Sequence, residues 1–135
     1  MKRVMGVDYG DARTGIAVSD LLCSIVGSTT VIHSRNKEKT IAQIKEMVEK
    51  MDVGEIVVGL PKNMNGTEGP KAARIRELAA LIEQELPVYL MDERMTTMSA
   101  ARYLNETNTR GKKRRGVIDT LSAQIILQNA LDRLR

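Results

Sequence analysis

The sequence predicts an α/β protein built on one mixed β-sheet with helices on both faces. Two short apolar runs lie close together near the amino terminus, with only turn residues between them. Further along the chain, short apolar runs alternate with stretches that have the period of a helix. The 135 residues suffice for one core and are too few for two, so we expect a single domain over residues 1–135.

The first part of the chain predicts an antiparallel meander. Residues 3–7 (RVMGV) form a short apolar run that ends in turn residues, and residues 14–19 (TGIAVS) form a second run shortly after it. This spacing favours a hairpin. Residues 28–33 (STTVIH) are rich in β-branched side chains and predict a third strand.

The pattern then changes to that of a helix followed by a buried strand. Asn36 is the expected N-cap, and Gly54 stands just past the expected end of the helix. Four apolar residues recur between them at helical spacing: Ile41, Ile44, Val48 and Met51. Residues 55–60 (EIVVGL) are uniformly apolar after the first position, which is typical of a parallel strand buried on both faces.

The next segment predicts a binding loop, a helix and another strand. Residues 61–70 (PKNMNGTEGP) are turn formers and amides, so we expect an exposed loop that holds binding groups. Thr67 or Glu68 is expected to open the helix, and Pro87 to end it. Residues 87–91 (PVYLM) then predict a buried strand that runs into the segment DERMTT.

The last third predicts two helices joined by a loop. Thr96 or Thr97 should cap a short helix that runs through Leu104. The polar and basic residues 105–116 predict a flexible loop, and the final helix is expected to start near Val117.

The charge pattern points to a polyanionic partner. The net charge is +4, and residues 110–116 (RGKKRRG) hold five cations and two glycines. A solvated loop and a phosphate-binding segment are both compatible with such a run. The candidate phosphate contacts here are Arg110, Lys112, Lys113, Arg114 and Arg115.

Composition excludes several other classes. The single Cys23 allows no internal disulfide and fits a reducing compartment. No apolar run approaches the roughly 18 residues of a membrane span, and the amino terminus lacks the apolar segment of a signal peptide. We therefore expect a cytoplasmic protein with no membrane partner.

Three carboxylates from distant segments are expected at one edge of the sheet. Asp8 ends the first strand, and Asp92 and Glu93 follow the last one. Asp119 lies on the final helix one turn before its apolar stripe, on the side that faces the sheet. Each acid alone also fits a turn or a favourable place near a helix amino terminus. Together they suggest a shared site at the ends of the strands.

An acidic cluster of this kind indicates metal-dependent phosphodiester hydrolysis. Its donors are oxygens alone, with no cluster of His or Cys, which favours Mg²⁺ or Mn²⁺ over zinc. One or two such ions activate water and stabilise charge on a phosphate. Arg13, Arg94 and the basic loop would meet the nucleic-acid backbone. Further candidate substrate contacts are Thr14, beside the end of the first strand, and Asn63 and Asn65, in the loop after residue 60.

Four motifs together resemble the YqgF (RuvX) family of the RNase H-like superfamily. They are GVDYGDARTGIAVSD, VVGLPKNMNGTEG, YLMDERMTT and IDTLSAQIILQ, and in order and spacing they cover nearly the whole chain. The resemblance implies a mixed five-stranded sheet flanked by helices and an acidic site for two metal ions. Position by position, it implies that Asp8, Glu93 and Asp119 form the acidic triad. The matching basic and hydroxyl neighbours are Arg13, Arg94, Thr96 and Thr97.

The resemblance also implies a function in RNA processing. The family is described as a nuclease for the 5′ end of pre-16S rRNA, and Holliday-junction resolution is the alternative. The expected partners are therefore structured RNA, precursor rRNA or branched DNA. Resolution of a junction requires two active sites, which would make a weak homodimer a further expectation.

Two other interpretations compete with a nuclease. An actin-like or sugar-kinase ATPase also opens with Asp-x-Gly, but it needs two such domains around its nucleotide. A non-catalytic nucleic-acid-binding module explains the basic loop without the acids. With three Tyr and no Phe or Trp, the composition argues against single-strand binding through stacked bases.

Overall fold

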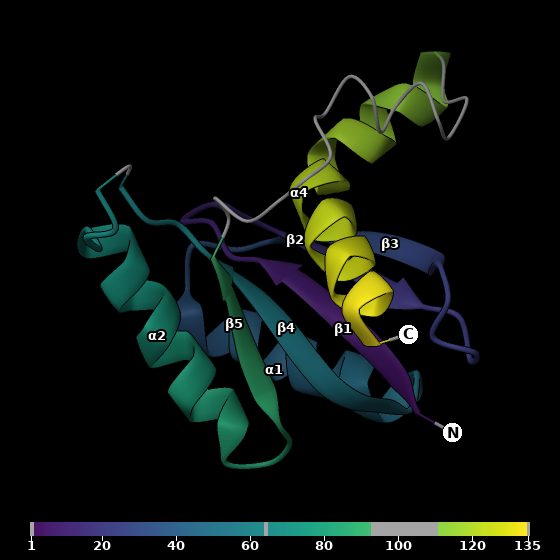
Figure 1. Cartoon of the computed structure of the whole chain (residues 1–135), viewed down its shortest axis with the longest axis horizontal. Coiled ribbons are helices and arrows are strands. Elements are labelled where there is room, and N and C mark those ends of the chain that lie inside the picture. The colour runs from purple at the N-terminus through teal and green to yellow at the C-terminus, as the bar shows by residue number, and fades with distance from the viewer. Residues whose placement is uncertain (1, 64, 93–110, 135) are drawn as a thin grey trace.

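The computed structural model describes residues 2–63, 65–92 and 111–134, and gives only the backbone for residues 111–119 and residue 134. The strands, in chain order, are β1 (Arg3–Asp8), β2 (Arg13–Ser19), β3 (Val26–His33), β4 (Val53–Leu60) and β5 (Val88–Asp92). The described helices are α1 (Lys37–Lys50), α2 (Pro70–Glu83) and α4 (Gly111–Leu134). Figure 1 shows their arrangement.

One mixed sheet contains all five of these strands, in the order β3-β2-β1-β4-β5. The pairs β1–β2 and β2–β3 are antiparallel, whereas β1–β4 and β4–β5 are parallel. The predicted meander and the predicted mixed α/β sheet are both confirmed. Each predicted strand is present and begins within two residues of its expected start.

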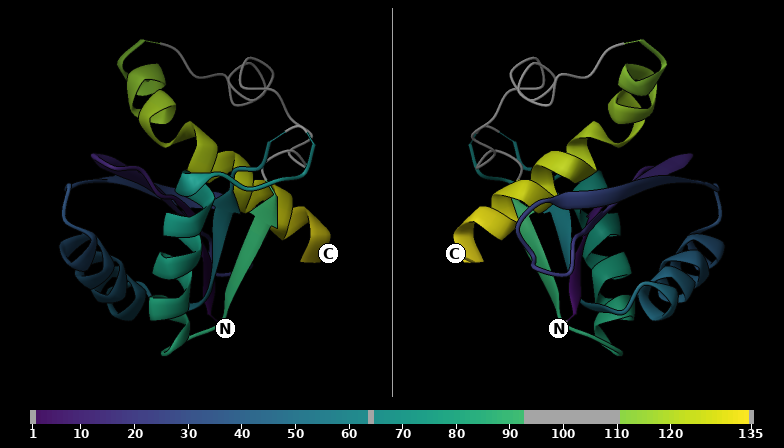
Figure 2. Two further views of the ribbon diagram at one scale, coloured as in Figure 1. Left: turned by 90° about the vertical axis from the view of Figure 1, so that its left-hand side faces the viewer. Right: turned by 90° about the vertical axis from the view of Figure 1, so that its right-hand side faces the viewer.

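Alternating side chains of β1 pack into two separate cores. Met5 and Val7 belong to the larger core, which α1 and α2 close on one face of the sheet. Val4 belongs to the second core, which α4 closes on the other face. Figure 2 shows the sheet between α4 and the other two helices. The expected placement of helices on both faces is confirmed.

Gly6 brings β1 and α4 into close contact. A Cβ atom at this position would lie 2.8 Å from the carbonyl oxygen of Ala123 and 2.8 Å from the Cβ atom of Leu127. Both distances are well inside the normal carbon contact of about 3.5–4.0 Å. The missing side chain therefore sets how closely α4 approaches the strand.

The predicted start of α1 is confirmed, but its end differs from the expectation. The Asn36 side chain accepts a hydrogen bond from the Lys39 backbone N–H at 3.0 Å, which makes it the N-cap. Beyond the helix, the residue with left-handed backbone is Asp52 (φ 54°), and Gly54 lies inside β4. Asp tolerates the left-handed conformation better than most residues, so Asp52 takes the place at the helix end that was expected for Gly54.

The helix α2 starts later than expected. Gly69 is the N-cap and Pro70 is the first helical residue, so neither Thr67 nor Glu68 opens the helix. Proline is favoured there because its backbone nitrogen has no partner to lose and its φ angle suits a helix. Glu68 instead accepts two hydrogen bonds from Arg76, at 2.6 and 2.7 Å, and ties the preceding loop to α2.

The helix α4 starts earlier than expected. It begins at Gly111, so residues 111–116 are helical and the prediction of a loop through residue 116 is wrong for them. Lys and Arg are good helix formers, and one glycine within a helix costs only about 1 kcal/mol. The expected short helix through Leu104 lies outside the described residues. Within the described part of the chain, no helix combines the length and apolar character needed to cross a bilayer.

Candidate active site

The carboxyl ends of the three parallel strands lie together at one edge of the sheet (Figures 1 and 2). Asp8 ends β1 and Asp92 ends β5. Val7 pairs with Val58, and Leu60 pairs with Asp92, so both acids stand at the same end of their strands. Ligands of open α/β sheets bind at such an edge.

The side chain of Asp8 points to the face of the sheet that α4 covers. Its neighbour two residues back on the strand is Gly6, which touches α4, and the alternation of a strand puts both on one face. The residue is half-buried. Burial raises the pKa of the Asp8 carboxyl above its usual value, and the positive charge of Lys71 offsets part of this rise. A divalent cation at this carboxylate would favour the ionised form much more strongly.

The backbone of α4 carries Asp119 to the level of Asp8. Gly6 lies against Ala123 and Leu127, and α4 runs opposite to β1, with its carboxyl end near the start of the strand (Figure 1). Two residues along a strand advance about 6.6 Å, and four residues along a helix advance about 6 Å. The step from Gly6 to Asp8 therefore matches the step from Ala123 back to Asp119. The side chain of Asp119 is outside the described atoms.

Two buried polar side chains follow Asp119 on α4. Thr120 and Gln124 are both buried, and the Gln124 side-chain amide donates a hydrogen bond to the Thr120 hydroxyl at 2.9 Å. The apolar stripe that was expected one turn after Asp119 is confirmed, because Ala123, Ile126 and Ala130 are buried against the sheet.

The loop after β4 is exposed and uses its amide side chains to hold its own shape. The Asn63 side-chain amide donates to the Thr67 hydroxyl at 2.9 Å. The Asn65 side-chain oxygen accepts from the Thr67 backbone N–H at 3.1 Å and from its hydroxyl at 2.7 Å. Gly66 completes the turn with a φ angle of 87°. The two asparagines thus order an exposed loop at the edge where Asp8 lies.

The two candidate contacts on β2 are placed very differently. Arg13 opens the strand and is exposed, opposite His33 of β3. Thr14 is completely buried, and its hydroxyl has no hydrogen-bond partner among the residues that the structure describes. Thr14 lies on the same face of β2 as Ile16, in the core under α1 and α2. We correct the expectation that Thr14 contacts substrate, because its side chain has no exposed surface.

Most of the other candidate residues cannot be placed by their side chains. Glu93, Arg94, Thr96, Thr97 and Arg110 lie outside the described residues. Lys112, Lys113, Arg114 and Arg115 lie in the first turns of α4, which project beyond the sheet at the end where Asp8 lies (Figure 1). Of the candidate triad, the structure describes the side chain of Asp8 alone.

Sequence reasoning missed Lys71, the cation whose charge acts on Asp8. It occupies the first turn of α2, directly after Pro70. A positive charge in the first turn of a helix opposes the helix dipole, and this mismatch was a usable signal of a role other than helix stability.

The chemistry of the donor set fits a hard divalent cation. Among the described side chains, no cluster of three or more His, Cys, Asp or Glu could hold a metal ion. The described side chains include only one of the three expected ligands, Asp8. Asp8 itself is a half-buried carboxylate at an open strand end, which suits Mg²⁺ or Mn²⁺. Asp8, Glu93 and Asp119 are the residues that would hold such ions.

The fold is that of RuvC-like resolvases, within the RNase H-like class. The chain superimposes on Thermus thermophilus RuvC in complex with a Holliday junction substrate with a TM-score of 0.63, at 14% identity, over 99% of this chain and 96% of that one. The fowlpox virus resolvase in complex with Holliday junction DNA gives a TM-score of 0.57 at 9% identity, over 98% of both chains. At these identities the likeness concerns the fold alone, and the predicted fold class is confirmed.

The chain belongs to the RuvX family. The family model described as "Holliday junction resolvase" matches residues 2–133. A relative from Moorella thermoacetica is 45% identical over 134 residues, which covers 98% of this chain and 96% of the relative. One from Halothermothrix orenii is 43% identical over 132 residues, or 96% of this chain and 94% of the relative. Both relatives bear the name "Putative pre-16S rRNA nuclease". The predicted family is confirmed.

Proposed function

We propose that this protein is a metal-dependent endonuclease that processes the 5′ end of pre-16S rRNA in the cytoplasm. The observation that carries the proposal is the half-buried Asp8 carboxylate, held at the end of β1 and level with the Asp119 position of α4. A carboxylate placed there at the cost of desolvation is better explained by a cation than by a turn. Membership in a family whose relatives are named as nucleases supports the same chemistry.

Each residue would have a distinct part in the reaction. Asp8, Glu93 and Asp119 would hold the ions, most simply two of them. When bound, Mg²⁺ or Mn²⁺ lowers the pKa of water and neutralises charge on the scissile phosphate. Because β1 and α4 are packed together through Gly6, Asp8 and Asp119 are held on rigid elements, and little reorganisation is needed when substrate binds.

Cations around the edge would bind the nucleic-acid backbone. Arg13 is exposed at the start of β2, and residues 110–115 lead into the projecting end of α4. Such phosphate contacts position a substrate without reading its sequence. Arg94, Thr96 and Thr97 complete the proposed surface, together with the loop that Asn63 and Asn65 hold in shape.

A cleavage panel tests the proposal. Precursor rRNA, duplex RNA and a four-way DNA junction are each incubated with Mg²⁺ or Mn²⁺ and either wild-type protein or Asp8→Asn. We expect wild type to cut the precursor rRNA and Asp8→Asn to leave it intact. Preferential cutting of the junction would support the activity that the family description gives, and would contradict the RNA assignment. Equal cutting by both proteins would show that the site is misplaced.

The same panel bears on the oligomeric state. A weak homodimer is part of the proposal only for junction resolution, because two cuts need two sites. A protein that sediments as a monomer and cuts precursor rRNA once would support the single-site reaction.

A further inference from the structure

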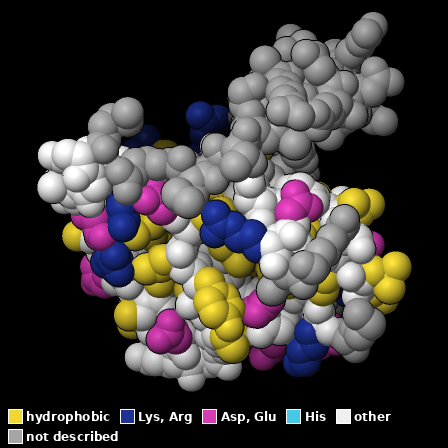
Figure 3. Space-filling model, viewed as in Figure 1, with side chains coloured by type: hydrophobic (Ala, Val, Ile, Leu, Met, Phe, Trp, Pro, Cys, Tyr) yellow, Lys and Arg dark blue, Asp and Glu magenta, His cyan; other side chains and the backbone are white. Residues whose placement is uncertain are grey.

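A shallow groove of about 320 Å³ lies beside α4, on the face of the sheet to which Asp8 points. It exists because α4 covers β1, β2 and β3, touches β4 and leaves much of β5 open. The lining residues are Glu55, Val57, Tyr89, Leu90, Met91, Ala130 and Arg133. Figure 3 shows hydrophobic, basic and acidic side chains together on this face, between β5 and the end of α4.

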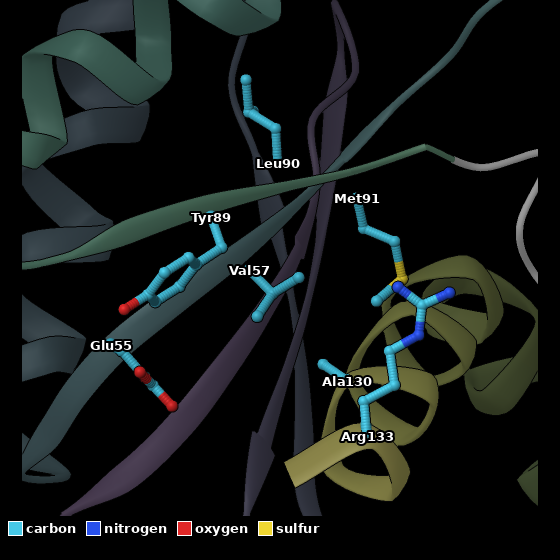
Figure 4. A pocket seen from close by; sticks show the side chains of 7 residues that line it. All are labelled: Glu55, Val57, Tyr89, Leu90, Met91, Ala130 and Arg133. Atoms are coloured by element: carbon cyan, nitrogen blue, oxygen red, sulfur yellow. The ribbon is translucent and has the colours of Figure 1, made fainter.

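The groove has two flat walls of different chemistry. Figure 4 shows the Tyr89 ring on one side and the Arg133 guanidinium on the other, with Val57 and Ala130 between them. An aromatic ring and a guanidinium plane are the two side-chain surfaces on which nucleobases stack. Tyr89 is 55% exposed, so one face of its ring is open to a ligand among the residues that the structure describes.

Two charged side chains, Glu55 and Arg133, line the groove. Neither Glu55 nor Arg133 makes an ion pair or a side-chain hydrogen bond within the part of the chain that the structure describes. A guanidinium can bind a phosphate, and a carboxylate can accept from the exocyclic amino group of a base. In Figure 4 the Glu55 carboxylate lies on the Tyr89 side, which separates the two functions across the groove.

The groove and Asp8 lie on the same face of the sheet and near the same edge. Met91 pairs with Gly59, which is level with Asp8. Tyr89 pairs with Val57, two residues further from the edge of the sheet. Two strand spacings across the sheet amount to about 10 Å, and two residues along β5 add about 6.6 Å in the other direction. A nucleotide in the groove is therefore near enough to Asp8 for both to contact the same nucleic-acid strand.

We infer that this groove binds one unpaired nucleotide of the nucleic-acid substrate, with its base on Tyr89 and its phosphate at Arg133. The volume is at the lower end of the range for small-ligand sites, about 300–1,000 Å³, and so suits a single nucleotide. The inference rests on the proposed function, which supplies the nucleic acid. The scarcity of aromatic residues excludes a row of stacked bases, but one ring is enough for one nucleotide.

Tryptophan fluorescence tests this binding without cleavage. The chain has no Trp, so Tyr89→Trp places a single reporter in the groove. Leu22→Trp is the matched control, since Leu22 is 71% exposed in the β2–β3 turn, outside the groove. Each variant is titrated in EDTA with a short single-stranded RNA, the same sequence as DNA, and the corresponding duplex. We expect saturable quenching of Tyr89→Trp by a single strand, and none of Leu22→Trp.

Affinity measurements on the tyrosine itself complete the test. Anisotropy of a labelled single strand should show binding weakened about 5- to 150-fold by Tyr89→Ala and retained by Tyr89→Phe. Quenching by RNA alone or by DNA alone supports the groove and identifies its sugar preference. Quenching by duplex as strong as by single strands, equal quenching of the two Trp variants, or unchanged binding by Tyr89→Ala would overturn the inference. Since no cleavage is measured, an inactive enzyme that still shows quenching would count only against the proposed function.

Discussion

The contact between Gly6 and α4 provides a sharp test of how the fold positions the site. Gly6→Ala adds a Cβ atom 2.8 Å from the Ala123 carbonyl oxygen and from the Leu127 Cβ atom. Relief of both contacts requires α4 to move by about 0.7–1.2 Å, because normal separations are about 3.5–4.0 Å. Overpacking of this kind costs about 1–3 kcal/mol in the free energy of unfolding.

The expected loss of stability can be measured directly. For a chain of this length the cost corresponds to a fall in Tm of roughly 4–12 °C. Gly69→Ala is the matched control, because a Cβ atom at the Gly69 N-cap lies within 4 Å of no described atom beyond its chain neighbours. We expect that control to remain within about 1 kcal/mol of wild type. Urea unfolding and thermal melts of the two variants provide the comparison.

The same shift should affect catalysis. The helix carries the Asp119 backbone, so a displacement near 1 Å changes its position relative to Asp8 and should lower kcat by up to about 10²-fold at a temperature where the protein is folded. If Gly6→Ala melts with wild type and cleaves at the same rate, then α4 does not pack against β1 as described, and the reasoning is refuted.

Three other predictions concern the charges of the site. Burial raises the pKa of Asp8, so its ionisation destabilises the fold as the pH rises through that pKa. Asp8→Asn should therefore match or exceed the wild-type Tm at pH 8. Mg²⁺ or Mn²⁺ at ten times its Kd should stabilise wild type by about 1.4 kcal/mol and leave Asp8→Asn unchanged. Equal metal-induced shifts in the Tm of both proteins would argue against a metal site at Asp8. Lys71→Gln removes the charge that lowers this pKa and should move the acid limb of the pH–rate profile to higher pH, while Lys39→Gln should leave the limb in place. Replacement of residues 112–115 by Gln should weaken binding of RNA and flatten its dependence on log salt by about 0.7–0.9 for each phosphate that these side chains neutralise in the wild type; an unchanged slope would remove this segment from the binding surface.

Local patterns in the sequence were enough to predict the sheet. Apolar runs bounded by turn residues located four strands, β-branched residues located β3, and the Asn36 cap located the start of α1. These features depend on residues that are neighbours in the chain. The order of apolar, turn-forming and capping residues is therefore enough to detect them.

Helix ends and tertiary contacts were harder to predict. At α2 the Gly69-Pro70 pair outcompeted Thr67 and Glu68, and at α4 the helix extended through cations that were expected in a loop. The burial of Thr14 depends on which face of β2 it occupies, and the effect of Lys71 on Asp8 joins two segments that are far apart in the chain. Periodicity within one segment contains no information on such contacts.

The central claim is that Asp8 is part of a metal-dependent site for phosphodiester cleavage. Its most direct test compares cleavage of precursor rRNA by wild type, Asp8→Asn and Asp11→Asn over a titration of Mg²⁺ or Mn²⁺. Asp11 is the matched control, since it is an exposed acid three residues further on that pairs with Arg74. We predict metal-dependent cleavage by wild type and Asp11→Asn, and loss of cleavage at every metal concentration in Asp8→Asn. Cleavage by Asp8→Asn at the wild-type rate would contradict the account.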